Sequence, residues 1–145
     1  MLHKKQAHQI IEDICTINQT QWDNPRGVHE PIKGASLLVE EAFESIGVPE
    51  ARDAARAIVA TAGSHATPIT EVDSFDAYLD IIYVAIGELH KLGLRPPQIV
   101  DGLQLVHNAN LAKSGNKDAT GKVTKPTDFV GPEAGLQLIL DQRTS

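Results

Sequence analysis

Apolar residues recur along most of the chain at the three- and four-residue spacing that places side chains on one face of an α-helix. The residues that indicate the first helix are Ile10, Ile11, Ile14 and Ile17. Further helices are predicted over residues 33–46, 49–62, 70–93, 96–113 and 133–141. Alternation with a period of two is sustained nowhere, which argues against a sheet-based fold. We therefore expect an all-α fold with a four-helix-bundle core.

Turn-forming residues mark the ends of these predicted helices. The first helix should end before the turn-rich segment 22–27, and Gly47 should end the second. Pro49 suits the first position of the third helix, because a proline there needs no hydrogen-bond donor. Thr70 and Asp73 resemble a capping box at the start of the fourth helix. The breaks in the pattern therefore agree with its periodicity.

The composition fits one globular domain over residues 1–145, with an extended or hairpin-like segment over 114–132 before the last helix. The net charge of -6 and the lack of a long basic run argue against a nucleic-acid surface. The single cysteine, Cys15, cannot form an intramolecular disulfide. No apolar run has the length of a signal peptide or a membrane span. We expect a cytoplasmic protein that binds neither nucleic acid nor membranes.

Acidic residues interrupt two of the apolar runs. Glu41 and Glu44 are three positions apart, and Asp76 and Asp80 are four apart, so each pair shares one helix face. Such a pair alone is most often a solvated helix face. However, carboxylates are rarely buried unless they are paired or bind metal, and neither run contains a basic residue. We therefore expect these four side chains to hold two or more divalent ions, with neighbouring Glu40 orienting or deprotonating a metal-bound water.

Several short motifs together resemble those of the all-α nucleoside triphosphate pyrophosphohydrolases, the MazG-like superfamily. They lie at residues 40–44, 76–83, 106–113, 121–126 and 129–132. The most similar branch is the phage and bacterial one, with Asp-x-x-x-Asp followed by Val-His-x-x-Asn-x-x-Lys. The resemblance covers residues 32–140 or thereabouts. One departure is Ala77, which stands where the commoner superfamily motif has the first residue of Glu-x-x-Asp, so that Asp76 takes this role.

The resemblance implies Mg²⁺- or Mn²⁺-dependent hydrolysis of (deoxy)nucleoside triphosphates to the monophosphate and pyrophosphate. Asn110 and Lys113 lie one helical turn apart and would bind phosphate oxygens, although each could equally be a solvated surface residue. Lys122 and Lys125 would close over the phosphates, or else be solvated loop lysines.

Selection of the base is expected from the N-terminal part of the chain. The indole of Trp22 offers a stacking face and Asn18 offers hydrogen bonds to a base edge, although Trp22 could instead plug the end of the bundle. Tyr83 could border the sugar or belong to the core. His107 matches the motif without an assigned role. A preference for purine nucleotides such as dGTP or dATP, as in phage nucleotide metabolism, is conceivable.

The apolar fourth helix also bears on assembly. Ile81, Ile82 and Val84 stand on a helix that is apolar nearly all round, which is typical of a helix inside a bundle. Four or five short helices are too few to cover all of their own apolar faces. We therefore expect a homo-oligomer. The resemblance implies a dimer or a tetramer.

Two other classes compete with the enzyme. A di-iron carboxylate bundle expects Glu-x-x-His pairs, and neither His90 nor His107 follows a glutamate at that spacing. A non-catalytic helical module that binds a nucleotide or a partner could have kept the acidic residues, and Ala77 is the one feature that favours it. Release of pyrophosphate would separate this module from the enzyme.

Overall fold

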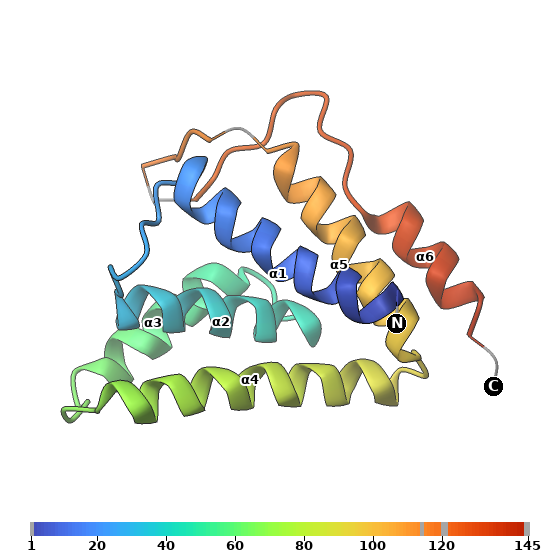
Figure 1. Ribbon diagram of the computed structural model, residues 1–145. Coiled ribbons are helices and arrows are strands. Elements are labelled where there is room, and N and C mark those ends of the chain that lie inside the picture. Colours follow the sequence, from blue (N-terminus) through green and yellow to red (C-terminus); the bar gives the residue numbers. More distant parts are fainter. Residues whose placement is uncertain (1, 114, 120–121, 144–145) are drawn as a thin grey trace. The chain divides into compact units, whose positions relative to one another are not determined.

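The computed structural model describes residues 2–113, 115–119 and 122–143, which contain six helices and no strand, as predicted. The helices are α1 (Leu2–Thr20), α2 (Pro31–Ser45), α3 (Ala51–Gly63), α4 (Glu71–Lys91), α5 (Pro96–Leu111) and α6 (Glu133–Asp141) (Figure 1). Within this part of the chain, no helix combines the length and the apolarity that a membrane crossing requires.

The chain divides into two compact units, which are described separately. The α2–α3 unit comprises Arg26–Phe75. The α1–α5–α6 unit comprises Met1–Pro25 and Asp76–Ser145. The first turn of α4 belongs to the α2–α3 unit and the rest of that helix to the other unit.

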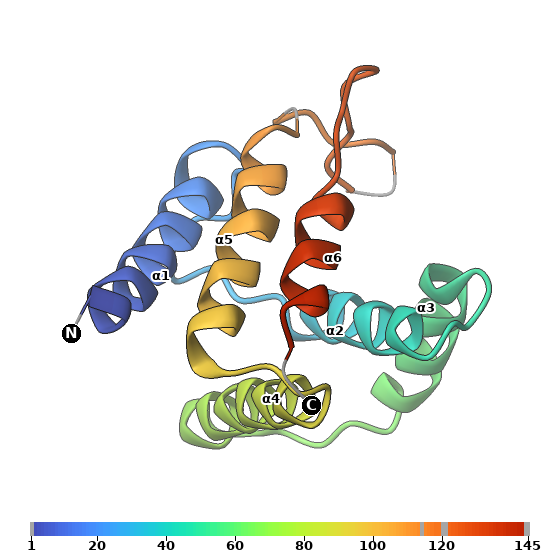
Figure 2. The ribbon, with the colours of Figure 1, turned by 90° about the vertical axis from the view of Figure 1, so that its right-hand side faces the viewer.

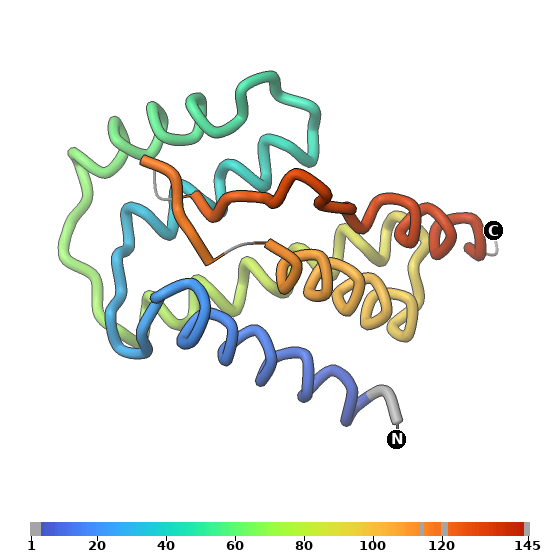
Figure 3. Tube along the Cα trace, turned by 90° about the horizontal axis from the view of Figure 1, so that it is seen from above, coloured from blue at the N-terminus to red at the C-terminus, as the bar shows by residue number. Residues whose placement is uncertain are grey.

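In the α2–α3 unit, the two helices pack against each other as an antiparallel pair (Figure 3). Gly47 ends α2 as predicted, because its φ of 75° turns the chain and its N–H bonds to the carbonyl of Glu44. The small residues Ala51 and Ala55, with Val59, are the buried positions of α3, four residues apart. A Cβ atom on Gly63 would lie 2.8 Å from Cδ1 of Ile32, so the helices approach closely here.

The predicted start of α3 at Pro49 was wrong by two residues. Glu50 adopts a left-handed conformation, with φ of 53°, and so precedes the helix as its N-cap. The helix itself begins at Ala51, and Pro49 belongs to the turn. Proline position therefore marks this boundary only approximately.

In the α1–α5–α6 unit, α5 lies between α1 and α6 (Figure 2). Ile10 and Ile17, two turns apart on α1, are both buried. Glycines bring α5 and α6 close together, because a Cβ on Gly135 would lie 2.8 Å from Cδ1 of Leu105. An apolar cavity of about 290 Å³ opens where these two helices meet the end of α4. Its lining includes Leu89, Leu94, Ile99, Gly102, Leu103 and Leu136.

Helix α4 begins as predicted, since the N–H of Asp73 bonds to the hydroxyl of Thr70 at 3.1 Å and that hydroxyl donates to the Asp73 carboxylate. None of its residues is buried. Its exposed large apolar side chains are Val72, Phe75, Leu79, Ile81, Ile82, Tyr83, Val84 and Ile86. Among the described residues, the expectation that this helix is covered by a bundle is therefore not met.

After α5, the described part of the chain folds back on itself as a short hairpin. An antiparallel bridge joins Lys117 to Val123, and the N–H of Thr124 bonds to the carbonyl of Asn116 at 2.9 Å. The prediction of a hairpin-like segment is thus confirmed for these residues, while residues 114, 120 and 121 of the predicted segment lie outside the described ones.

Adjacent isoleucines on α1 test the packing of this helix. Ile10 is 2% exposed and Ile11 is 62% exposed. We expect Ile10→Ala to lower the free energy of unfolding by about 2–5 kcal/mol, because it leaves a cavity. Ile11→Ala should change it by only about 0.5 kcal/mol, because water already surrounds that side chain. Urea denaturation followed by circular dichroism measures both values, and equal losses would contradict the burial of Ile10.

Candidate functional site

The predicted carboxylates of α2 differ in exposure. Glu40 is only 6% exposed, whereas Glu41 and Glu44 are exposed. All three lie on the last two turns of α2, so the helix presents two solvated carboxylates beside a buried one. A buried carboxylate costs several kcal/mol unless a cation or hydrogen bonds offset its loss of water. Glu40 is therefore the acidic residue of α2 whose environment matters most.

A source of positive charge that the sequence reasoning missed is present on α3. Arg52 and Arg56 lie one turn apart on this helix, both partly buried, and α3 packs against α2. Arginine is the cation best suited to a partly buried site, because its charge is spread and weakly hydrated. The absence of basic residues from the part of α2 that carries the glutamates therefore does not require a metal ion near Glu40. The signal was present in the sequence as two arginines at helical spacing in an alanine-rich run.

The predicted carboxylates of α4, Asp76 and Asp80, are both exposed and lie one turn apart on the helix. Within either unit of the described chain, no three His, Cys, Asp or Glu side chains form a group suited to a metal ion. The four predicted ligands draw on both units, since α2 belongs to the α2–α3 unit and Asp76 begins the other. Carboxylate oxygens of this kind suit Mg²⁺ and Mn²⁺.

The predicted phosphate-binding residues of α5 are in contact. The ammonium group of Lys113 donates a hydrogen bond to Oδ1 of Asn110 at 2.5 Å. The backbone carbonyl of Lys113 in turn accepts a bond from Nε2 of Gln21 at 2.9 Å. This second bond is partly buried and joins the C-terminal ends of α1 and α5. Gln21 was missed by the sequence reasoning, because nothing in the sequence indicated that α1 and α5 pair.

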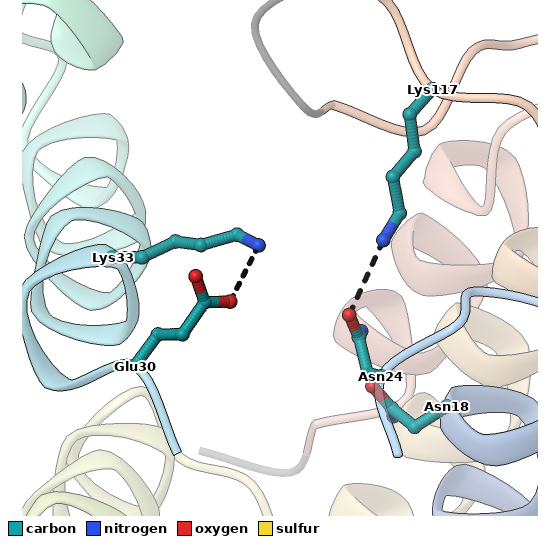
Figure 4. Close-up of polar contacts among 5 residues, drawn as sticks. All are labelled: Asn18, Asn24, Glu30, Lys33 and Lys117. Carbon is teal, nitrogen blue, oxygen red and sulfur yellow. Dashed lines mark hydrogen bonds and ion pairs between the residues drawn. The ribbon is translucent and has the colours of Figure 1, made fainter. Parts of the chain in front are cut away.

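A chain of amide groups continues from the end of α1 to the hairpin. The side-chain amide of Asn24 donates to Oδ1 of Asn18 at 2.9 Å, and Nζ of Lys117 donates to Oδ1 of Asn24 at 3.3 Å (Figure 4). Figure 4 also shows the separate pair of Lys33 and Glu30 in the α2–α3 unit, 2.9 Å apart. Lys117 is thus a second lysine near the predicted base-binding residues. It was missed because only the lysines of the motif were considered.

Trp22, the predicted stacking residue, follows directly after α1 and is partly buried. Its indole Nε1 is buried and has no hydrogen-bond partner among the described residues. A buried N–H group without an acceptor costs about 1–3 kcal/mol. The side chain therefore offers a polar group that an added acceptor would satisfy, besides its aromatic face.

The remaining predicted substrate residues are on the surface. Tyr83 is 81% exposed, so the alternative core role is wrong for the described chain. The ammonium group of Lys125 lies 5.0 Å from the centre of the Phe129 ring, a cation–π contact that holds the lysine along the segment after the hairpin. Lys122 is exposed, and its backbone N–H donates to the carboxylate of Asp118 at 3.0 Å. Within the part of the chain that the structure describes, the Lys125 ammonium contacts Phe129 rather than another predicted site residue.

A second cavity, of about 300 Å³, lies between α1 and α5 and is here called the α1–α5 cavity. It is lined by Asp13, Thr16, Ile17, Thr20, Gln21, His107 and Leu111. His107 is only 4% exposed, and its ring makes no hydrogen bond among the described residues. A partly polar cavity with a buried imidazole at its wall is a candidate ligand site. The sequence singled out His107 but gave it no partner.

Comparison with known proteins adds no relative, since no protein-family model, curated protein or solved structure matches this chain.

The bond between Gln21 and Lys113 allows a test of the α1–α5 pairing. We expect Gln21→Ala to lower the free energy of unfolding by about 1–2 kcal/mol, because it leaves the partly buried Lys113 carbonyl without its donor. Gln9→Ala is the control, since the exposed Gln9 bonds to Asp13 one turn further along the same helix and its loss should cost about 0.3 kcal/mol. Thermal and urea unfolding measure both. Similar small losses would show that the bond contributes little to the pairing.

Proposed function

We propose that this chain hydrolyses (deoxy)nucleoside triphosphates to the monophosphate and pyrophosphate, using Mg²⁺ or Mn²⁺. In this proposal Glu41, Glu44, Asp76 and Asp80 bind the ions, and Glu40 positions or activates the attacking water. Asn110 and Lys113 bind phosphate oxygens. The proposal draws on the motif resemblance and on the contacts at the ends of α1 and α5.

The observation that supports the proposal best is the pairing of Asn110 with Lys113. An ammonium group that a neighbouring amide orients is a suitable ligand for phosphate oxygens, because a charged donor makes strong hydrogen bonds to them. Lys117 belongs to the same unit, and its ammonium contacts Asn24, which follows the C-terminal end of α1. Two lysines and several amides at the joined ends of two helices are the groups that a triphosphate would need.

The chemistry assigns a separate task to each carboxylate. Attack on the α-phosphorus requires an activated water and neutralisation of the charge on the phosphoryl oxygens, both of which divalent ions supply. Exposed carboxylates such as Asp76 and Asp80 remain hydrated until an ion arrives, so they impose little cost on the empty protein. Glu40 differs because its burial limits the water around it, which favours a single ordered hydrogen-bonded arrangement.

Pyrophosphate release tests the activity. We expect turnover of at least one of the eight common ribo- and deoxynucleoside triphosphates with Mg²⁺ or Mn²⁺. Glu41→Gln and Asp80→Asn should each lower kcat/KM by about 100-fold or more, because each removes a charged metal ligand. Glu40→Gln should lower kcat by about 10²–10⁴-fold if the carboxylate activates water.

The matched control for these variants is Glu88→Gln. This glutamate lies on the surface of α4 and pairs with Lys91 of the same helix, so its neutralisation should leave turnover unchanged. Circular dichroism and thermal unfolding would establish that each variant is folded. A folded chain that releases no pyrophosphate from any of the eight nucleotides would reject the enzyme and favour the non-catalytic binding module.

We also propose that the chain forms a homo-oligomer through α4. The support is the exposure of this helix, none of whose residues is buried although its sequence is apolar nearly all round. Contiguous exposed apolar surface of this kind is rare on monomeric proteins. A second copy that covered α4 would bury its apolar side chains, as is typical of a helix that is apolar nearly all round.

Light scattering coupled to size exclusion tests the assembly. We expect a mass of two or four times the chain mass of 15.7 kDa. Ile82→Lys should shift the protein toward the monomer, because it places a charge on the exposed apolar surface of α4. Leu138→Lys is the control on α6, where a comparably exposed residue changes in the same way. A monomeric parent protein would reject this mode of assembly.

A further inference from the structure

The α1–α5 cavity presents mainly hydrogen-bond acceptors, because three of its polar side chains already use a donor hydrogen elsewhere. The hydroxyl of Thr16 donates to the carbonyl of Glu12 at 2.9 Å, and that of Thr20 donates to the carbonyl of Thr16 at 2.8 Å. Nε2 of Gln21 donates to the carbonyl of Lys113 at 2.9 Å. Each of these side chains keeps its oxygen lone pairs as acceptors.

A carboxylate adds charge to these acceptors. Asp13 lines the cavity and accepts one hydrogen bond, from Nε2 of Gln9 to its Oδ1 at 2.9 Å. A carboxylate has two oxygens and can accept about four hydrogen bonds, so most of its capacity remains. The lining therefore combines one negative charge with several neutral acceptors.

The imidazole of His107 is the second observation that points to a ligand. Its side chain is buried yet makes no hydrogen bond among the described residues, and it lies at the wall of the cavity. Buried polar groups are nearly always hydrogen-bonded, so a polar group from a ligand would complete its environment. Ile17 and Leu111 supply apolar surface, which suits a flat group.

We propose that the α1–α5 cavity binds a planar N–C–N group whose two nitrogens both carry N–H donors. Such a group pairs with a carboxylate through two parallel hydrogen bonds, and Asp13 is the carboxylate that lines this cavity. Two sources carry this group: the guanine base, through N1–H and the 2-amino group, and the guanidinium of an arginine-like compound. The guanine source rests on the proposed function and would make the cavity its base-recognition site, whereas the guanidinium source does not depend on that function.

Nuclear magnetic resonance titration of the intact chain, without metal, tests the proposal. The panel is guanosine, inosine, adenosine and methylguanidine, and the readout is the ring resonances of His107. We expect guanosine or methylguanidine to shift these resonances saturably. If guanine is the source, inosine should bind about tenfold more weakly or worse, because it lacks the 2-amino group, and adenosine should not bind. Binding of methylguanidine alone would identify the guanidinium source.

Asp13→Asn should weaken binding by about tenfold or more, because it replaces one acceptor oxygen with an N–H donor. Glu12→Gln is the matched control, since this neighbouring carboxylate contacts His8 on the exposed side of α1 and its change should leave the affinity unaltered. The proposal is overturned if no compound of the panel shifts the His107 resonances, or if the two variants have equal affinities.

The outcome is independent of catalysis, because nucleosides carry no phosphate and no metal is added. A chain that binds guanosine through Asp13 but hydrolyses no nucleotide would uphold the α1–α5 cavity and reject the enzyme. A chain that releases pyrophosphate while His107 responds to no compound would reject the cavity and uphold the enzyme.

Discussion

The helices of this chain carry more apolar surface than the chain itself covers, and most of its properties depend on this imbalance. The buried apolar side chains are few and mostly small or on α1 and α3, whereas α4 has large apolar residues and buries none of them. Because exposed apolar area costs roughly 25 cal/mol per Å², a second surface that covered α4 would stabilise the fold substantially. The proposed assembly would therefore cover the same apolar pattern that produces the helices.

Periodicity and turn residues were sufficient to locate the helices. The predicted ranges 96–113 and 133–141 differ little from α5 (Pro96–Leu111) and α6 (Glu133–Asp141), since a proline marks the start of each helix. The start of α3 was misplaced because the left-handed conformation of Glu50 has no signature in the sequence. The covering of α4 was also beyond prediction, because an apolar pattern indicates that a surface is buried but not whether the partner belongs to the same chain.

The candidate site was predictable only where it is local. Asn110 and Lys113 share one helical turn, so their contact follows from their spacing, although their binding of substrate stays a prediction. Gln21 and Lys117 were missed, since they depend on the pairing of α1 with α5 and on the hairpin that follows. The environment of His107 also depends on the pairing of α1 with α5, because residues of both helices line its cavity. Motif reasoning selects residues along one helix, whereas a cavity is made by two.

Charge links the proposed activity to the whole chain. A nucleoside triphosphate is strongly anionic, and a chain with a net charge of -6 repels it at long range. Binding therefore requires local positive charge, which Lys113 and Lys117 supply at the ends of α1 and α5 and which divalent ions would supply on α2 and α4. In the proposed reaction the exposed carboxylates serve this second purpose, because an ion that they hold converts repulsion of the phosphates into attraction. The exposed carboxylates would thus stop repelling an anionic substrate only when they hold metal ions. The affinity for the nucleotide should therefore depend on the ion and not on the lysines alone.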